Sequence, residues 1–487
     1  MTLFGRYRPI VGDWAAFQEA LRRPLPTCIW TNTLRITPDR LAALLAQAGI
    51  QVEPLPWYPS AFKLAPDVLE NTQSIARDFR PGRRWEFLAG LYHVQEEVSL
   101  LPVVLMDPQP GERVLDLCAA PGNKTAQAAV TMANRGTVVA NDRSFLRMRA
   151  TRQVLERLGL VTVSTVTSNG ASFPGEAGLF DRILVDVPCT SEGTSRKKPA
   201  ILDETGADRF RARSGIQRAL LRRAVALCRP GGRIVYSTCT YAPEENEAVV
   251  DALLQESMTA EEGPLLRLLP ARITGFHSSD GLTEWNGLRF HHSLQHTMRV
   301  WPHQNNSGGF FVALLEKEGV PAEPQDMASA MAADEEDSSP WLALLEERFG
   351  IPSTAFAGYR VLRRSRDGIT VTSGDHQAPD RPKPDATGLF FMRTHMRYPK
   401  LTTGAAMLFG PAATRNVIEL DEEQVQAYLA RQTIAVSEAQ SQRCTDTGYV
   451  LVRHQDAVLG VGLYFAQGTG MGGHVRSLYP KAWSPFL

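Results

Sequence analysis

The sequence contains little cysteine, and its six cysteines are scattered along the chain. No two of them have the Cys-x-x-Cys spacing that is typical of structural zinc sites, so we expect no bound metal. Scattered thiols without a disulfide framework are typical of proteins in a reducing cytosol. A cytoplasmic location is therefore expected.

Long hydrophobic runs are also missing. No apolar stretch approaches the roughly 20 residues that a membrane-spanning helix needs, and residues 1–6 show no basic segment followed by an apolar core, as a signal peptide would. We therefore expect no membrane association. The 487 residues are 43% hydrophobic and 21% charged, which is typical of a folded chain of about two to four domains. No long apolar seam is evident, so we expect a monomer.

Net charge is absent too, because 52 basic residues balance 52 acidic residues. This balance counts against a protein that binds nucleic acid over its whole surface. Basic residues are nevertheless clustered at 143–157, 196–198 and 209–223, while acidic residues gather at 334–337. The basic clusters could neutralise phosphates, or they could be solvated faces of helices.

Hydrophobic periodicity predicts an α/β fold. Residues 1–95 are expected to form a small N-terminal α/β module, with helices at 14–21 and 38–48 and a strand at 28–36. From 96 to 318, strands alternate with helices, which predicts a Rossmann-like, doubly wound parallel sheet. Its expected strands are 114–117, 136–140, 161–166, 180–186, 233–237 and 309–315, and its expected helices are 124–132, 144–158, 216–227 and 244–255.

The last third of the chain is expected to follow a linker at 319–339, which carries prolines, alanines and the acidic cluster. A short helix at 340–350 opens an intermediate module that we expect at 340–395. Residues 396–487 contain alternating segments separated by glycines and are expected to form a β-rich module.

The segment 116–125 (DLCAAPGNKT) follows a predicted strand and opens a predicted helix. A tight turn at that place lets backbone N–H groups approach a ligand at the carboxyl edge of the sheet. Because Gly122 is its only glycine, the segment is neither a dinucleotide fingerprint nor a phosphate-binding P-loop. It favours a small-molecule site, although a plain connection would also fit.

Polar residues follow the next two predicted strands. Asp142 could accept hydrogen bonds from a ribose diol, or it could cap the helix that begins beside it. Asn169 could offer an acceptor to an adenine amine, although Asn-Gly is also simply a good turn.

Two cysteines follow later strands of the same predicted sheet. Cys189 comes after the strand that ends at Asp186, and Cys239 comes after the strand at 233–237. Parallel strands end at one edge of a sheet, so both thiols are expected beside the 116–125 turn. A lone cysteine is usually a small buried hydrophobe, but two at strand ends, near an acid, indicate reactive thiols.

Three motifs, DLCAAPGNKT (116–125), VDVPCTSEGT (185–194) and STCTYAPEENE (237–247), resemble those of the Nol1/Nop2/Sun family of RNA cytosine-C5 methyltransferases. The upstream segment 90–96 and the closing segments 299–303 and 308–313 are similar to that family as well. The resemblance covers about residues 20–318. The long C-terminal extension is most similar to that of bacterial 16S rRNA members, in which it contains a PUA-like RNA-binding module.

The resemblance implies methyl transfer from S-adenosylmethionine to carbon 5 of cytosine in RNA, with 16S rRNA or the small ribosomal subunit as partner. Cys239 would add to C6 of the base, and Cys189 would remove the C5 proton and so release the product. Asp186 and Lys124 would contact the base or the cofactor. The implied cofactor-binding residues are Cys118, Ala119, Ala120, Pro121, Gly122, Asn123, Lys124, Asp142, Asn169 and Asp186.

The chain departs from the family pattern at three places. Asn123 replaces a usual second glycine, and since Asn tolerates a left-handed backbone, we expect the turn to survive. Thr190 and Ser191 replace a usual Ser-Gly pair. Asn169 replaces a usual aspartate but keeps an acceptor oxygen.

Other functions stay open at this point. A tRNA substrate is the rival within the enzyme class. A DNA cytosine methyltransferase would take its nucleophile from the proline-cysteine motif, and a non-catalytic RNA-binding assembly factor would need neither thiol. Four histidines lack the spacing of metal ligands and are expected to be surface or supporting residues: His291, His292, His296 and His303.

Overall fold

The computed structural model describes residues 3–64, 80–199, 207–258, 266–319, 335–366, 368–396, 398–466 and 473–484. Most of the predicted linker, residues 320–334, and with it Asp334 of the acidic cluster, lies outside the described residues. No helix in the described ranges is long and apolar enough to cross a membrane.

The N-terminal region is built on a four-stranded sheet in the order β2-β3-β1-β4. Helix α1 (Trp14–Arg22) precedes the sheet, and α2 (Pro38–Gln47) and α4 (Trp85–Leu88) belong to it. The strands are β1 (Cys28–Thr31), β2 (Val52–Leu55), β3 (Tyr58–Leu64) and β4 (Tyr92–Val94). The predicted strand at 28–36 ends earlier, at Thr31, because Asn32 opens a turn and its side chain donates to the carbonyls of Gly90 and Leu158.

The central sheet confirms the Rossmann-like prediction. Its order is β11-β14-β15-β9-β8-β5-β6-β7-β18, with β10 beside β15. The pairs from β9 through β8, β5 and β6 to β7 are all parallel. The parallel strands are β5 (Arg113–Asp116), β6 (Thr137–Asp142), β7 (Val163–Thr167), β8 (Phe180–Asp186) and β9 (Cys228–Thr238). The order reverses at β5 and β8, which is where doubly wound sheets bind ligands.

Antiparallel strands extend the sheet beyond β9. They are β10 (Leu266–Leu269), β11 (Ser279–Asp280), β14 (Met298–Val300) and β15 (Phe310–Lys317). A small hairpin, β12 (Glu284–Trp285) with β13 (Leu288–Arg289), and the short helix α10 (Pro302–Asn305) lie in the same region.

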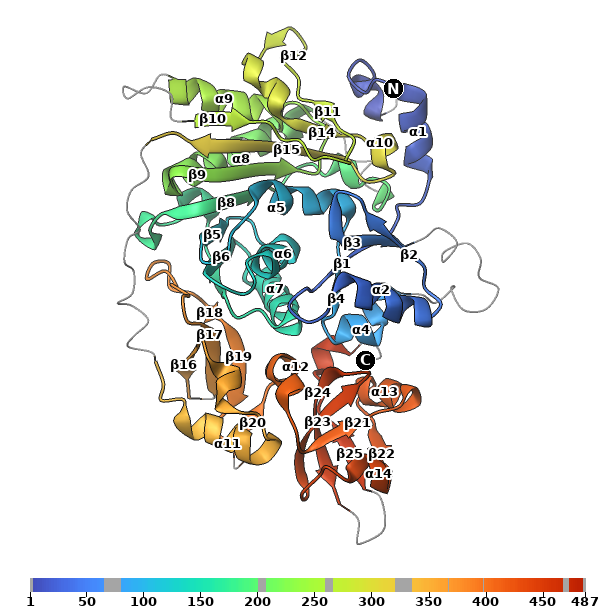
Figure 1. Ribbon diagram of the computed structural model, residues 1–487. Helices are drawn as coiled ribbons and strands as arrows, with labels where there is room; N and C mark the ends of the chain where they lie inside the picture. Colours follow the sequence, from blue (N-terminus) through green and yellow to red (C-terminus); the bar gives the residue numbers. More distant parts are fainter. Residues whose placement is uncertain are drawn as a thin grey trace.

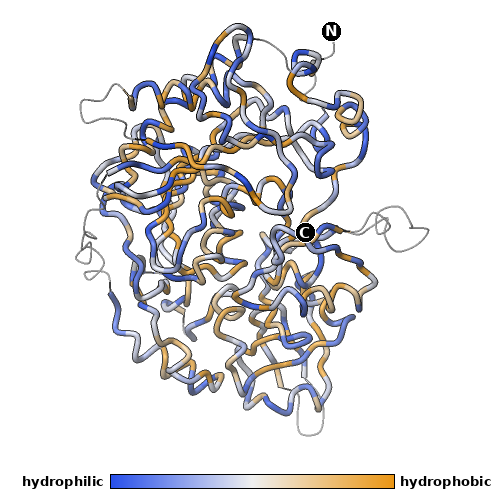
Figure 2. Tube along the Cα trace, turned by 45° about the horizontal axis from the view of Figure 1, so that its top comes forward, coloured by the Kyte–Doolittle hydropathy of each residue, from blue (hydrophilic) through white to orange (hydrophobic). Residues whose placement is uncertain are grey.

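Helices cover both faces of the central sheet (Figure 1). One face packs against α5 (Leu101–Met106), α6 (Asn123–Thr131) and α7 (Phe145–Leu158), and the other against α8 (Ala207–Leu227) and α9 (Glu247–Met258). Alternate strand residues supply the two cores, so Val114 faces the first layer and Leu115 the second. Hydrophobic segments accordingly concentrate along the inner strands (Figure 2).

Three boundaries in this region differ from the prediction. Helix α8 begins at Ala207 rather than at residue 216, because its arginine-rich first turns carry too few apolar residues to show a helical period. The strand predicted from residue 233 begins at Cys228, so Pro230-Gly231-Gly232 lies inside β9. The helix predicted from residue 244 begins at Glu247.

The intermediate region follows α11 (Ser339–Phe349) and forms a second four-stranded sheet, β16-β17-β19-β20. Its strands are β16 (Tyr359–Ser365), β17 (Gly368–Ser373), β19 (Leu389–Arg393) and β20 (Lys400–Leu401). Met392 pairs with Leu401, so this sheet crosses the expected boundary at 395. Strand β18 (Ala386–Thr387) instead pairs with β7 and forms the outer strand of the central sheet.

The C-terminal region is β-rich, as predicted. Its five-stranded sheet has the order β21-β23-β24-β25-β22, with strands β21 (Val417–Glu419), β22 (Thr433–Ala435), β23 (Gly448–His454), β24 (Ala457–Phe465) and β25 (His474–Ser477). The helices are α12 (Thr403–Phe409), α13 (Glu422–Leu429) and α14 (Glu438–Ser441). This sheet shares one hydrophobic core with the N-terminal module, and the C-terminal end lies beside α4 (Figure 1).

Candidate active site

A tight turn connects β5 to α6. Gly122 adopts a left-handed backbone, with φ of +99°, and a Cβ at this position would lie 2.8 Å from the Cγ2 atom of Thr151. Both observations require glycine. Asp116, at the end of β5, holds the turn because its carboxylate accepts hydrogen bonds from Thr125 Oγ1 at 2.6 Å and from the Cys118 amide at 3.3 Å.

The turn forms, as expected, but it needs no left-handed backbone at Asn123. The left-handed residue is Gly122, and Asn123 is the first residue of α6. The turn therefore does not depend on any backbone tolerance of asparagine. The Asn123 side chain is instead bonded to His93, at 3.0 Å between Oδ1 and Nε2.

A pocket opens at this turn. Seven of the residues implied by the family resemblance line it, together with Ser99 and Asp116: Cys118, Ala119, Ala120, Pro121, Asn123, Lys124 and Asp186. Sequence reasoning missed Ser99, because the only feature that could have indicated it is its position three residues after the segment 90–96. Burial, followed by repulsion from Asp186, raises the pKa of Asp116 to about 7.

Asp142 and Asn169 do not line this pocket. Asp142 is buried, pairs with Arg147 at 3.2 Å and accepts a hydrogen bond from the Ser144 amide. It does not cap α7, since Ser144 is the capping residue. Asn169 is exposed, and its side chain accepts a hydrogen bond from the Ala171 amide, as a residue in a turn does.

Lys124 and Asp186 form an ion pair between the pocket and the thiols. The Lys124 Nζ atom lies 2.6 Å from the Asp186 carboxylate, which also accepts a hydrogen bond from Ser237 Oγ at 2.7 Å. Burial, the largest single effect, lowers the pKa of Lys124, but the charge and hydrogen bond of Asp186 together with the charges of Cys239 and Asp116 outweigh it, and the net shift is upward. Ser237 lies two residues before Cys239, so the pair joins the pocket to the second cysteine motif.

The two predicted thiols lie together. Cys189 Sγ and Cys239 Sγ are 3.4 Å apart, at the ends of β8 and β9. The contact with Cys189 lowers the pKa of Cys239, and burial opposes this shift without cancelling it. The same contact raises the pKa of Cys189. The contact therefore makes Cys239 the more acidic of the two thiols.

A buried polar network holds the two cysteine loops in register. The hydroxyls of Thr190 and Thr240 are 2.8 Å apart. The Glu192 carboxylate accepts hydrogen bonds from Tyr7 at 2.7 Å, from Thr240 and from the Tyr241 amide. Sequence reasoning missed Tyr7 and Glu192, because the contact joins segments that are 185 residues apart.

The arginine cluster at 143–157 is not one solvated face. Arg157 is buried, and Arg152 pairs with Asp385 at 3.1 Å.

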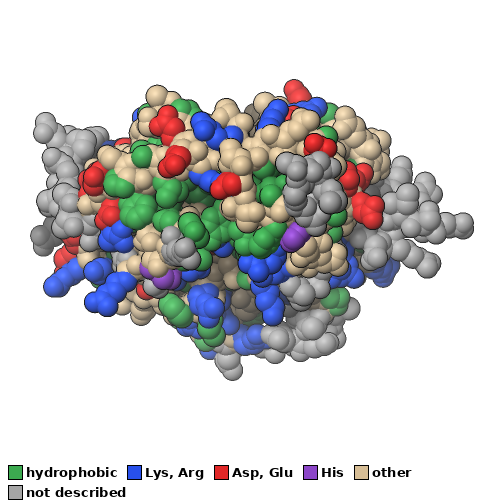
Figure 3. Space-filling model, turned by 90° about the horizontal axis from the view of Figure 1, so that it is seen from below, with side chains coloured by type: hydrophobic (Ala, Val, Ile, Leu, Met, Phe, Trp, Pro, Cys, Tyr) green, Lys and Arg blue, Asp and Glu red, His purple; other side chains and the backbone are tan. Residues whose placement is uncertain are grey.

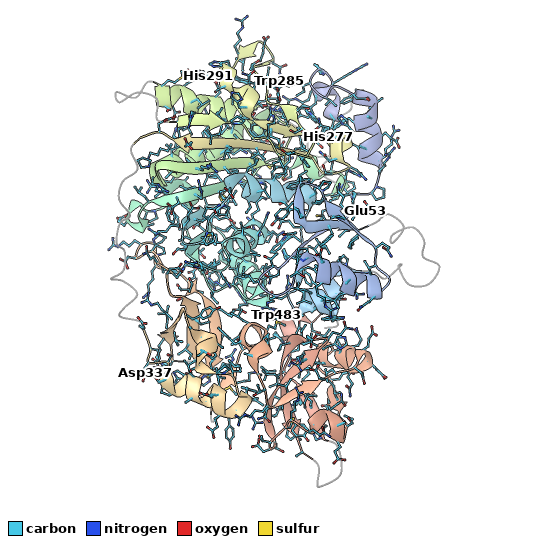
Figure 4. All side chains as sticks on the ribbon, viewed as in Figure 1. Glu53, His277, Trp285, His291, Asp337 and Trp483 are labelled. Atoms are coloured by element: carbon cyan, nitrogen blue, oxygen red, sulfur yellow. The ribbon has the colours of Figure 1, made fainter. Side chains whose placement is uncertain are left out.

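The four singled-out histidines belong to no metal-like cluster, since the described residues contain no group of three or more His, Cys, Asp or Glu side chains that could hold an ion. Figure 4 shows His291 in the upper part of the molecule, near Trp285.

Three family models match the chain. They are described as 16S rRNA methyltransferase RsmB/F (residues 103–316), an RsmF/B-like ferredoxin-like domain (6–68) and a methyltransferase RsmF PUA domain (415–484). The chain is similar to "Ribosomal RNA small subunit methyltransferase F" of Aeromonas hydrophila, with 30% identity over 96% of this chain and 92% of the relative.

Two further similarities each cover less than two thirds of the chain. A tRNA (cytosine(49)-C(5))-methyltransferase of Pyrococcus abyssi is 33% identical over 63% of this chain and 92% of its own length. The crystal structure of a methyltransferase homologue from Pyrococcus horikoshii matches with a TM-score of 0.55 and 34% identity, over 64% of this chain and 93% of that one. Several longer relatives are matched over only 36% to 48% of their length. The near-complete match to the Aeromonas relative, together with the three domain models in their order, shows that the chain belongs to the RsmF family of Nop2/Sun-related methyltransferases.

Proposed function

We propose that the protein transfers a methyl group from S-adenosylmethionine to carbon 5 of a cytosine in RNA. The single observation that carries this proposal is the pair of sulfur atoms 3.4 Å apart, supplied by two strand ends beside a small-molecule pocket. Separate nucleophile and base are what addition to a pyrimidine ring requires, because one group must bond to C6 while another removes the proton from C5.

The RNA substrate that fits best is 16S rRNA. The similarity to the Aeromonas relative extends through the C-terminal third, which contains the match to the PUA domain model. The tRNA-modifying relative is similar over 305 residues, or 63% of this chain. A tRNA substrate is the second candidate, supported by this shorter similarity.

The pocket suits an adenosyl amino acid. The glycine turn brings backbone close to the ligand, and both acidic and donor groups line the wall. The residues that would hold the cofactor are those of the turn from Cys118 to Lys124, with Asp186. Asp142 and Asn169 are proposed ribose and adenine contacts from the family resemblance. When bound, S-adenosylmethionine supplies the methyl group from its sulfonium.

The thiols divide the chemistry between them. The Cys239 thiolate adds to C6 of cytosine, which makes C5 an enamine carbon able to accept the methyl group. Asp186, held by Lys124 and Ser237, is our candidate for the group that contacts N3 and N4 and stabilises the charge that develops on the ring. Cys189, after its own proton has passed to water, accepts the C5 proton directly or through a water molecule. The C6–S bond then breaks, its electron pair returns to sulfur, and Cys239 leaves as a thiolate.

The target base must leave its stack to reach thiols at the edge of a sheet. Phosphate contacts along the neighbouring strand would stabilise such a bound RNA. Figure 3 views the molecule from below, where Lys and Arg side chains gather mainly in the lower half of the view and Asp and Glu mainly in the upper half. This separation of charge supports RNA binding by a chain with zero net charge.

Cysteine variants test the proposal. The Cys239→Ala variant should lose methyl transfer and form no protein–RNA adduct, because no thiolate can add to C6. The Cys189→Ala variant should accumulate an adduct that survives a denaturing gel, because the C5 proton is not removed. Cys444→Ala, in the C-terminal region, is the matched control and should behave as wild type.

The outcomes separate the competing functions. A Cys239→Ala enzyme that still methylates would favour a DNA-type mechanism with Cys189 as nucleophile. A wild-type protein whose melting temperature does not respond to S-adenosylmethionine would favour a non-catalytic assembly factor. Bisulfite sequencing of rRNA and tRNA from cells without the gene identifies the substrate.

We further propose that the protein acts as a monomer in the cytoplasm on the small ribosomal subunit or its RNA. All six cysteines are free thiols, which suits a reducing compartment.

A further inference from the structure

The side chain of Asn123 takes part in an interaction that the proposed chemistry does not use. Asn123 lines the pocket, and its Oδ1 atom lies 3.0 Å from Nε2 of His93. His93 belongs to β4 of the N-terminal module, is 5% exposed, and has no contact with the thiols.

The proton on His93 can be assigned from its second partner. Nδ1 of His93 lies 2.8 Å from an Nη2 atom of Arg157. A guanidinium group only donates hydrogen bonds, so Nδ1 must accept, and the neutral ring then carries its hydrogen on Nε2. Burial, followed by the Arg157 charge, lowers the pKa of His93 to about 3, so the ring stays neutral at working pH.

The orientation of the Asn123 amide follows from this assignment. Since Nε2–H is a donor, it must meet the amide oxygen, and the Asn123 NH2 group is left on the other side. No acceptor within the described ranges takes a hydrogen bond from this NH2 group. Asn123 therefore has two free donor hydrogens at a position that lines the pocket.

Arg157 is itself rigidly held. Its guanidinium donates to the carbonyl of Phe87 and lies 3.7 Å from the centre of the Phe87 ring, which in turn stacks on His93 at an interplanar angle of 16°. Arg157 is 5% exposed. A series of buried contacts thus runs from α7 through β4 to the first residue of α6.

The pocket wall carries both carboxyl groups and uncharged N–H donors, which suit different ends of an amino-acid ligand. Asp116 supplies a carboxyl group, which suits an ammonium group, whereas Asp186 is already paired with Lys124. Asn123 supplies uncharged N–H donors on α6, and such donors suit a carboxylate. A ligand that carries an ammonium group and a carboxylate on one carbon therefore fits this wall better than a ligand that carries only one of these two groups.

We propose that Asn123 recognises the carboxylate of the bound adenosyl amino acid, and that His93 and Arg157 are positioning residues that fix its amide with the NH2 group toward the pocket. This inference rests on the proposed function, because it names the ligand of the same site. It also assigns the N-terminal module a part in cofactor selection, through β4.

The test measures binding rather than methyl transfer. Calorimetric titration with S-adenosylhomocysteine is compared with titration of its decarboxylated analogue, which keeps the ammonium group. In the Asn123→Asp variant, a carboxylate replaces the donor, so affinity for S-adenosylhomocysteine should fall by roughly 10- to 100-fold, the equivalent of one hydrogen bond to a charged group. Affinity for the decarboxylated analogue should change by less than about threefold. The ratio of the two affinities cancels any general destabilisation of the variant.

A second variant tests the positioning residues. His93→Phe keeps a ring of similar size but frees the Asn123 amide to rotate, so affinity for S-adenosylhomocysteine should fall by about fivefold. Adding Asn123→Gly to His93→Phe should then cost little more, because the two residues act as one unit. His291→Phe, far from the pocket, is the matched control and should bind both ligands as wild type.

Equal losses for both ligands in Asn123→Asp, or additive losses in the double variant, would overturn the inference. Wild-type protein that binds neither ligand would instead refute the proposed function, so the two failures are distinguishable.

Discussion

Single backbone positions decide the shape of the cofactor turn. Gly122 and Gly111 both have strongly positive φ, at +99° and +91°. A Cβ at Gly111 would meet nothing within 4 Å, whereas a Cβ at Gly122 would meet Thr151 at 2.8 Å. Substitution of Gly111 therefore introduces backbone strain alone, whereas substitution of Gly122 adds a steric clash to that strain.

Gly111→Ala should lower the free energy of unfolding by about 1 kcal/mol, the cost of a left-handed alanine. Gly122→Ala should lower it by about 2–4 kcal/mol, because a clash in a packed site is added to the strain. Chemical denaturation of both variants measures the difference. Equal losses would show that Thr151 moves away at no cost.

At the same scale, the sequence predicted the thiol pair but not its surroundings. Cys189 and Cys239 could be assigned to one edge because parallel strands end together. Ser99 and Glu192 could not be found, since each reaches the site through tertiary contacts that no local pattern records. Asn123 was assigned to the cofactor site from the family resemblance, which gave no sign of the partner that its side chain has in His93.

Between elements, a series of hydrogen bonds connects four motif segments. The Glu96 carboxylate accepts from the Gly308 amide at 2.7 Å. The Gly309 amide donates to the Gly193 carbonyl, and the Gly193 amide donates to the Cys239 carbonyl, both at 2.9 Å. Glu96 is the one side chain in this series, and burial raises its pKa to about 7.

Glu96→Gln should flatten the pH dependence of stability between about pH 5 and 8. The folded state holds the Glu96 proton more tightly than the unfolded state, so this group stabilises the fold at low pH and loses that contribution as pH rises through 7. Glutamine keeps the acceptor and does not titrate. Glu96→Ala should cost about 1–3 kcal/mol at every pH, because the Gly308 amide loses its partner. Urea unfolding at pH 5 and pH 8 tests both, and a parallel pH response in wild type and Glu96→Gln would contradict the assignment.

Most elements were predictable from periodicity, and the exceptions have physical causes. The helix α7 and the strand β8 were found close to their true limits, because their apolar spacing is regular. The beginning of α8 was missed because arginines, rather than apolar residues, fill its first turns. The assignment of β18 to the central sheet was beyond reach, since a two-residue strand carries no pattern.

On the scale of the whole molecule, the first and last modules share one core. Trp85 of α4 and Tyr479 near the C-terminus belong to the same hydrophobic cluster, and the Tyr479 hydroxyl donates to the Leu88 carbonyl at 3.2 Å. Trp483, labelled in Figure 4, lies at this junction. The two modules should therefore lose their structure together.

Tyr479→Ala should lower the free energy of unfolding by about 3–5 kcal/mol, as removal of a buried aromatic ring does. Tyr479→Phe removes only the hydroxyl and should cost about 1 kcal/mol. Hydrogen exchange should accelerate in β1–β4 as well as in β21–β25 of the alanine variant. Acceleration confined to the C-terminal sheet would contradict the shared core.

The docking of β18 on β7 has a consequence for biosynthesis. The polypeptide completes one flank of the catalytic sheet at β15 and supplies the opposite flank only with Ala386 and Thr387. During translation the β7 flank therefore presents unpaired backbone until the C-terminal part has left the ribosome, and unpaired strand edges are prone to aggregate. Maturation of the catalytic unit thus waits for residues that take no part in its chemistry.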